Sequence, residues 1–205
     1  MADVVIHQIT ADRFDDLAEV FGTRGAPSWC WCQYFLTTGS DYTMSAERNR
    51  GALRSQVASS KAPVGLVAYA ATESHGDAAG QAVGWVQIGP RTTFPRITAN
   101  RDMKRLVDDL DDDLHDDSVW AVTCFVVKVG QRRRGIGGAL LDAAVAAARD
   151  AGARAVVGHP VDVAARNTRV GGSELYHGAA STFERSGFRV VGRTGATRPV
   201  MRLDL

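Results

Sequence analysis

The segment from Arg132 to Gly138 combines three arginines with three glycines directly before an expected helix. Glycine permits positive φ and close backbone approach, and the first N–H groups of a helix attract an anion together with the helix dipole. These residue types predict a pyrophosphate-binding loop. The Gly-Lys-Ser/Thr ending of a P-loop is absent, and Leu140 stands where a dinucleotide fingerprint starting at Gly135 needs Gly or Ala. A turn without a ligand is the alternative interpretation.

Three cysteines, Cys30, Cys32 and Cys124, could supply a reactive thiol. Their odd number, with no export signal, favours reduced thiols over a disulfide framework. Cys30 and Cys32 alternate with tryptophans, and without a second pair they indicate a metal site only weakly, so aromatic packing at a ligand entrance is favoured. Cys124 as an acyl-enzyme nucleophile is the alternative to a buried structural thiol, which is favoured because nothing near it in sequence indicates a lowered pKa.

An acidic run lies between residues 102 and 117, where apolar residues recur at helical spacing. A solvated helix face is the favoured interpretation. The alternative is a carboxylate cluster near the mouth of a site, which would attract a cationic ligand. The aspartates are Asp102, Asp108, Asp109, Asp111, Asp112, Asp113, Asp116 and Asp117.

The chain of 205 residues, with 45% hydrophobic and 23% charged residues, predicts one globular domain over residues 1–205. A net charge of +1 gives no general affinity for nucleic acid or anionic membranes. No run of 18 apolar residues occurs, and the first 20 residues are rich in acidic side chains. We therefore expect a cytoplasmic protein without a signal peptide or membrane span.

Apolar periodicity and Gly or Pro punctuation predict mixed secondary structure. Strands are expected at residues 4–9, 63–71, 82–89, 119–129, 153–157, 188–191 and 200–203. Helices are expected at residues 14–21, 45–61, 102–117, 137–150 and 174–186. Residues 25–35 and 162–173 are expected to be irregular. The order predicts an α/β (α+β type) fold, with one βαβ unit inside a mostly antiparallel sheet.

The pattern Arg132-x-x-Gly135-x-Gly137 between a strand and a helix resembles the hallmark of the GCN5-related N-acetyltransferases. A later helix that runs into Gly187-Phe188 and a strand is similar to a second feature of this family. The resemblance extends over about residues 82 to 204. The Cys-Trp-Cys stretch at 30–32 looks like that of a bacterial subgroup, over a shorter and less specific match.

The resemblance implies the GNAT fold, a mixed central sheet with helices on both faces, and acetyl-CoA as cosubstrate. It implies that the backbone of Val127 contacts the pantetheine arm, with Phe125 and Val126 at the preceding bulge. A free N–H on this strand would stabilise the oxyanion that forms when an amine attacks the thioester. The implied phosphate-loop residues are Arg132, Arg133, Arg134, Gly135, Ile136, Gly137 and Gly138.

The chain departs from the family at the usual general acid. Many members have a Tyr four residues before the Gly of the Gly-Phe pair, and Phe183 stands there. Tyr176 stands seven residues earlier, two helical turns before Phe183 and on nearly the same face of the expected helix. Tyr176 is therefore the candidate acid for the departing thiolate, and packing of its ring is the alternative.

His159 is the candidate base, because it follows the strand at which the two central strands of this family splay apart. An imidazole with an ordinary pKa near 6.5 suits the deprotonation of an ammonium group. The alternative is a structural histidine beside Pro160. His177 and Glu174 are weaker candidates.

The resemblance and the residues together predict an N-acetyltransferase that transfers acetyl from acetyl-CoA to a primary amine by direct nucleophilic attack. A non-catalytic acyl-CoA-binding module is the alternative, favoured by the absence of Tyr at position 183. The acceptor cannot be identified from the sequence, although the acidic run favours a cationic one. Neither a metal, a nucleic acid nor a membrane is expected as a partner, and a homodimer is common in the family.

Overall fold

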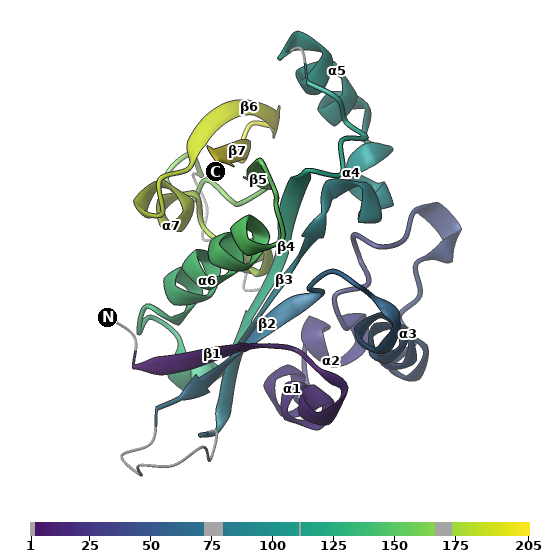
Figure 1. Cartoon of the computed structure of the whole chain (residues 1–205), viewed down its shortest axis with the longest axis vertical. Coiled ribbons are helices and arrows are strands. Elements are labelled where there is room, and N and C mark those ends of the chain that lie inside the picture. The colour runs from purple at the N-terminus through teal and green to yellow at the C-terminus, as the bar shows by residue number, and fades with distance from the viewer. Residues whose placement is uncertain (1–2, 72–79, 111, 167–173) are drawn as a thin grey trace.

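The computed structural model describes residues 3–71, 80–110, 112–166 and 174–205. These residues form a seven-stranded sheet in the order β1-β2-β3-β4-β5-β7-β6 (Figure 1). Only the β4–β5 pair of this sheet is parallel, which confirms the predicted mixed, mostly antiparallel fold. The strands are β1 (Val4–Gln8), β2 (Gly65–Ala70), β3 (Ala82–Pro90), β4 (Val119–Val127), β5 (Ala155–Gly158), β6 (Arg189–Gly195) and β7 (Arg198–Asp204).

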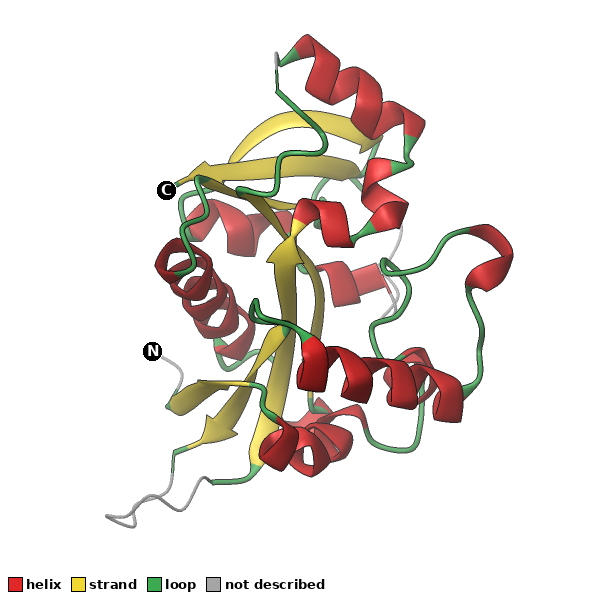
Figure 2. Ribbon diagram, turned by 45° about the vertical axis from the view of Figure 1, so that its right-hand side comes forward, coloured by secondary structure: helices red, strands yellow, loops and turns green. Residues whose placement is uncertain are grey.

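Helices cover both faces of the sheet (Figures 1 and 2). On one face lie α6 (Ile136–Asp150) and α7 (Ala180–Arg185), and their buried side chains form one cluster with the sheet. On the other face lie α1 (Phe14–Phe21), α2 (Ala26–Cys30) and α3 (Ala46–Ser59). A third cluster packs α4 (Pro95–Thr98) and α5 (Arg101–Asp109) at one end of the sheet. No helix within the described ranges is long and apolar enough to cross a membrane.

The βαβ unit β4–α6–β5 forms as the apolar pattern predicts. Nearly every side chain of β4 is buried, because α6 covers one face of this strand and α1 the other. Leu140, Leu141 and Ala144 belong to the buried stripe of α6. The helix begins at Ile136, where Gly135 with φ 82° caps it in the left-handed conformation that glycine adopts without strain.

The parallel strands β4 and β5 separate after a short pairing. Their register runs from Val119↔Ala155 to Val122↔Gly158, and β5 then ends before Pro160. Beyond Val122, β4 continues to Val127 with β3 as its only strand partner in the described ranges. On the β5 side, residues 174–177 pack against this part of β4 in place of a strand.

The expected helix 174–186 is wrong, because the chain forms two short pieces there. A 3₁₀ turn, η5 (Glu174–His177), is followed by Gly178 with φ 80°, and α7 begins only at Ala180. A bridge between Val161 and Ala179 fixes the break. Tyr176 and Phe183 therefore do not share one face of a helix.

Two other boundaries differ from the sequence-based expectation. Residues 26–30, expected to be irregular, form α2, which has Pro27 in its first turn. The helix expected at 102–117 ends at Asp109, because later aspartates form turns through their side chains, as Asp113 does to the N–H of His115. Residues 72–79 and 167–173, expected to be irregular, lie outside the described residues.

Candidate active site

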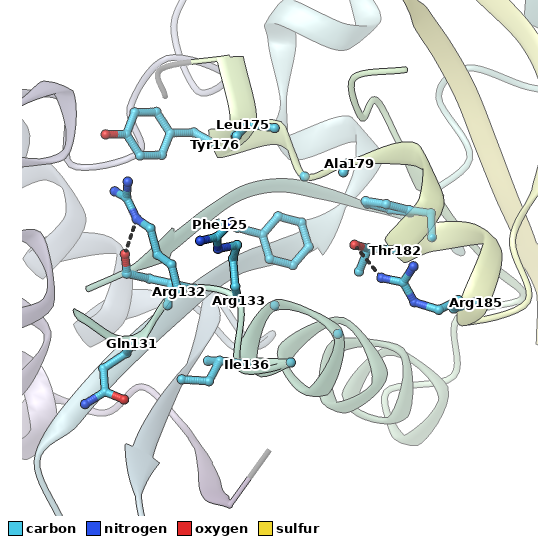
Figure 3. Close-up of a pocket in the computed structure, with 16 residues that line it drawn as sticks. Phe125, Gln131, Arg132, Arg133, Ile136, Leu175, Tyr176, Ala179, Thr182 and Arg185 are labelled. Atoms are coloured by element: carbon cyan, nitrogen blue, oxygen red, sulfur yellow. Dashed lines mark hydrogen bonds between the residues drawn. The ribbon is translucent and has the colours of Figure 1, made fainter. Parts of the chain in front are cut away.

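A first cavity of about 450 Å³ lies between β4, the start of α6 and the η5–α7 segment (Figure 3). It is open to solvent at the arginine-rich loop that leads into α6. The lining residues are Phe125, Val127, Gln131, Arg132, Arg133, Gly135, Ile136, Gly137, Gly138, Leu175, Tyr176, Gly178, Ala179, Thr182, Phe183 and Arg185.

The phosphate-loop geometry is built into the backbone of this cavity. Arg133 has a left-handed φ of 61° and Gly135 a φ of 82°, and these turns direct the chain into the first turn of α6. A Cβ added to Gly137 would meet no protein atom within 4 Å, so this glycine borders open space. The first N–H groups of a helix lack intrahelical partners, and here they border a cavity that can hold an anion.

The predicted cofactor residues divide over the two sides of β4. Phe125, Val127, Arg132 and the loop residues Arg133 to Gly138 line the first cavity, apart from Arg134, whose guanidinium donates to Gln131 Oε1 at 2.6 Å. Val126 points to the opposite side of the strand and lines another cavity. This follows from the alternation of side chains along a strand.

The backbone of Val127 is turned toward the gap that β5 leaves. The N–H of Lys128 donates to the Val83 carbonyl at 3.0 Å. In an antiparallel pair the neighbouring residue then points its N–H and C=O away from the partner strand. Arg132 Nε donates to the Val127 carbonyl at 3.1 Å (Figure 3), while the Val127 N–H has no hydrogen-bond partner among the described residues.

A second cavity of about 340 Å³ lies on the other side of β4, under α2 and the chain that follows it. Its walls are mainly apolar and aromatic, and its polar groups are mostly thiols and phenols. The lining residues are Ala26, Pro27, Trp29, Cys30, Cys32, Tyr34, Phe35, Tyr42, Thr123, Cys124, Val126, Tyr176 and His177. Most of them come from the N-terminal segment, for which the sequence favoured aromatic packing at a ligand entrance.

Tyr176 lines both the first and the second cavity. Its ring extends from η5 beyond the arginine-rich loop (Figure 3). The Tyr176 hydroxyl lies near Gly25, since a Cβ added to that glycine would be 3.9 Å from the hydroxyl oxygen. Burial raises the pKa of this phenol, with Arg132 acting in the opposite direction. Tyr176 is therefore protonated at neutral pH and stands between the two cavities.

The three cysteines gather at the second cavity as thiols. Cys32 Sγ lies 3.0 Å from Cys124 Sγ and accepts from Trp85 Nε1 at 3.3 Å, while Tyr42 donates to Cys30 Sγ at 3.4 Å. Burial is the main cause that raises the pKa of Cys30 and of Cys32. No cluster of three or more His, Cys, Asp or Glu suited to a metal is found among the described residues.

A third cavity of about 210 Å³ is lined mainly by polar and basic side chains. Its residues are Tyr34, Phe35, Arg96, Ile97, Asn100, Met103, His159, His177, Thr194 and Arg198. Tyr34, Phe35 and His177 also line the second cavity, so the two adjoin. His159 lies here and not at the first or second cavity.

The two buried histidines are neutral at neutral pH. Burial, His177 and the positive charges of Arg91 and Arg198 lower the pKa of His159 to about 4. Burial and Arg198 likewise lower the pKa of His177 to about 4. His177 Nδ1 lies 3.3 Å from the Thr123 carbonyl, and this contact requires the proton to be on Nδ1. His177 Nε2 then carries the lone pair.

The acidic run contributes no carboxylate to the three cavities in the part of the chain that is described. Asp112 forms ion pairs with Arg91, Arg154 and Arg202, at 3.3, 2.6 and 3.0 Å. Asp116 pairs with Arg154 at 2.7 Å, and hydrogen bonds from Ser118 and Arg154 lower its pKa to about 2. The described part of the run therefore anchors loops at the sheet end.

Comparison with known proteins gives one family match and many structural ones. Residues 26–169 match the acetyltransferase (GNAT) family. A comparison with curated protein sequences gives no match.

Similar solved structures include a GCN5-related N-acetyltransferase from Kribbella flavida, with 18% identity, 99% of this chain and 98% of that chain covered, and a TM-score of 0.52. The PaiA N-acetyltransferase of Thermoplasma acidophilum, in complex with coenzyme A, has 15% identity over 98% and 99% of the chains and a TM-score of 0.52. A polyamine N-acetyltransferase of Drosophila melanogaster, which forms N-acetylagmatine, has 16% identity over 99% and 100% and a TM-score of 0.53. At these identities the likeness shows the fold.

Proposed function

Because this chain belongs to the acetyltransferase (GNAT) family, whose cosubstrate is acetyl-CoA, we propose that it transfers acetyl to a primary amine by direct attack. In this proposal the first cavity binds the pyrophosphate and pantetheine of acetyl-CoA, and the second cavity binds the amine. The observation that carries the proposal is that Tyr176 lines both cavities, beside the part of β4 that β5 leaves open.

Binding of the cosubstrate is assigned to the arginine-rich loop and to β4. The helix N-terminus at Ile136 and Gly137 faces the pyrophosphate, and Arg133 adds positive charge at the cavity wall. The Val127 N–H donates to the thioester carbonyl oxygen. This hydrogen bond strengthens as negative charge develops on that oxygen during attack.

The chemical step needs two proton movements. The amine nitrogen forms a bond to the thioester carbon, the carbon–sulfur bond breaks, and Tyr176 donates its phenolic proton to the departing sulfur. The attacking nitrogen loses one proton, which we assign to His177 Nε2 through intervening water in the second cavity. The low pKa of this imidazole leaves its lone pair free at neutral pH and also makes it a weaker base than an ordinary histidine.

His159 receives a different role from the one expected of it. Its ring lines the third cavity and is absent from the walls of the two cavities that adjoin β4 at Tyr176. We therefore assign His159 to acceptor binding.

A non-catalytic acyl-CoA-binding module is the second candidate function. Phe183 favours it, since this ring is fully buried against Phe125 and Phe188 and offers no hydroxyl where many family members have one. Release of free CoA separates the two functions. With acetyl-CoA and a panel of primary amines, we expect CoA release that depends on the amine and yields the N-acetyl product. Tight acetyl-CoA binding without amine-dependent release would support the binding module.

A further inference from the structure

We infer that the acceptor is an amine whose apolar body ends in a carboxylate, and that Arg96 and Arg198, with His159, bind this carboxylate in the third cavity. This inference rests on the proposed function. It places the reacting amine beside Tyr176, the apolar body in the second cavity and the anion at the opposite end. The acceptor is then zwitterionic, and the acceptor site excludes polycations.

The third cavity is lined by two arginines and, among the described residues, by no carboxylate. In the described residues, Arg96 and Arg198 belong to none of the ion pairs. The nearest carboxylate that acts on Arg198 is that of Glu174, which is itself paired with Arg166. Two guanidinium groups in one small cavity favour a planar anion, because their N–H groups match the two oxygens of a carboxylate.

Arg96 is held in place before any ligand binds. Its guanidinium carbon lies 4.1 Å from the ring centroid of Tyr34 and 5.6 Å from that of Tyr42, and its Nε donates to the Tyr34 carbonyl at 2.5 Å. These contacts involve the faces of the two tyrosine rings and only one N–H group of Arg96. The remaining N–H groups of Arg96 are available to an anion, and little side-chain entropy is lost when it binds.

A buried histidine nitrogen in this cavity also lacks a partner. Within the described ranges, His159 Nε2 is inaccessible to solvent and has no hydrogen bond. Buried polar atoms in folded proteins nearly always have a partner. His159 lines the third cavity through its residue, so a ligand there would reach Nε2 once the side chains that cover this atom shift. A neutral imidazole with its proton on Nε2 would donate to the same carboxylate as the two arginines.

The second and third cavities together define the length of the acceptor. They share Tyr34, Phe35 and His177, and His177 touches β4 at Thr123, four residues from Val127. A strand advances roughly 3.3 Å per residue, so Thr123 and Val127 lie about 13 Å apart along β4. The third cavity adjoins the second at His177, so an acceptor that reaches from the thioester to Arg96 and Arg198 has its amine and its carboxylate well separated. An α-amino acid, whose amine and carboxylate are adjacent, does not fit both ends.

The expectation of a cationic acceptor rested on the acidic run. Asp112 and Asp116 of that run face arginines outside the cavities, and the charges that line the third cavity are positive. A polyamine would bring positive charge toward Arg96 and Arg198. The likeness to the Drosophila polyamine enzyme, at 16% identity, shows the fold alone.

Calorimetry on the CoA-saturated protein tests the inference without turnover. The probes are 4-(4-aminobutyl)benzoate, its methyl ester, phenylalanine and spermidine. We expect the acid to bind at least tenfold more tightly than the ester, which is about 1.4 kcal/mol. We expect phenylalanine and spermidine to bind more weakly than the acid. Equal affinity of acid and ester, or tighter binding of spermidine, would overturn the inference.

Two variants test whether Arg96 and Arg198 form the anion site. Arg96→Gln and Arg198→Gln should each reduce the preference for acid over ester to about threefold or less, while affinity for the ester stays unchanged. Arg149→Gln, on the exposed end of α6, removes the same charge away from the cavities and should keep the preference. A preference that survives in both cavity variants overturns the assignment, and the wild-type comparison stands even where a variant fails to fold.

Failure of the inference and failure of the proposed function give different results. If the ester and the acid are acetylated alike, the acceptor site is not anionic although the enzyme transfers acetyl. If no amine causes CoA release, the proposed acetyl transfer does not occur. The affinities of the acid and the ester then still decide whether an anion site exists.

Discussion

Tyr176 is the side chain on which proton delivery in the proposed reaction depends, because it lines both the cosubstrate and the acceptor cavity. Its raised pKa keeps it protonated until a thiolate forms beside it. Phe183 cannot take this role, since its ring is buried between Phe125 and Phe188. In the proposed reaction the proton donor therefore comes from the 3₁₀ turn before α7 and not from α7 itself.

Replacement of Tyr176 by Phe tests this role. We expect kcat to fall about 10- to 100-fold, because a general acid contributes at this level, while the Kd of CoA changes less than about twofold. Tyr69→Phe is the matched control, since it removes a hydroxyl that bonds Asp16 at 2.9 Å and does not line the cavities. An unchanged kcat in Tyr176→Phe would show that Tyr176 does not donate the proton and that its ring only packs between the cavities.

A direct-attack mechanism and an acyl-enzyme mechanism make different predictions for Cys124. Its sulfur lines the acceptor cavity and lies 3.0 Å from the sulfur of Cys32. We expect Cys124→Ser to keep kcat within about threefold, since serine preserves the size of the side chain. Protein incubated with radiolabelled acetyl-CoA and no amine should carry no stable label. Label at Cys124, together with loss of turnover in the variant, would establish an acyl-enzyme in place of direct attack.

The elements that hold the cosubstrate could be predicted from sequence, whereas the acceptor site could not. The arginine-rich loop and α6 follow one another in the chain, so their residue types alone describe the geometry. Arg96 and Arg198 come from α4 and the start of β7, and only tertiary structure brings them together. The break at Gly178 was also missed, because the apolar spacing of residues 174–186 suits a helix while positive φ ends it.

The first turn of α6 can be tested with one added side chain. Gly137→Asp puts a carboxylate into open space at the expected pyrophosphate site, so we expect the Kd of acetyl-CoA to rise at least tenfold. The fold should tolerate the change, because an acidic residue in the first turn of a helix is favourable. Gly51→Asp, on α3 and also free of contacts within 4 Å, is the control and should keep wild-type affinity. Wild-type affinity in a folded Gly137→Asp variant would mean that the cosubstrate binds elsewhere.

For the whole molecule, the two buried histidines make stability depend on pH. Their folded-state pKa values of about 4 lie below the ordinary 6.5, so the unfolded chain takes up protons first as pH falls. This contribution to the free energy of unfolding is fully present above about pH 6.5 and is lost toward pH 4. Each imidazole contributes at most roughly 3 kcal/mol to this loss.

Urea denaturation between pH 7 and pH 4.5 measures this dependence. The free energy of unfolding should fall steadily across the interval in the wild type, and less steeply in His159→Gln. His115→Gln, at an exposed position, should leave the slope unchanged. A wild-type stability that is flat over this range would show that neither imidazole is held neutral by the fold.

The central claim is that the cosubstrate cavity and the acceptor cavity form one continuous site at Tyr176. The Kd of a bisubstrate compound, in which the sulfur of CoA is joined through an acetyl linker to phenethylamine, tests this claim most directly. Both cavities would be filled at once, so calorimetry should give a Kd at least tenfold lower than that of CoA, or about 1.4 kcal/mol. A Kd equal to or higher than that of CoA would contradict the account, because the amine-bearing half would then find no site beside the thioester.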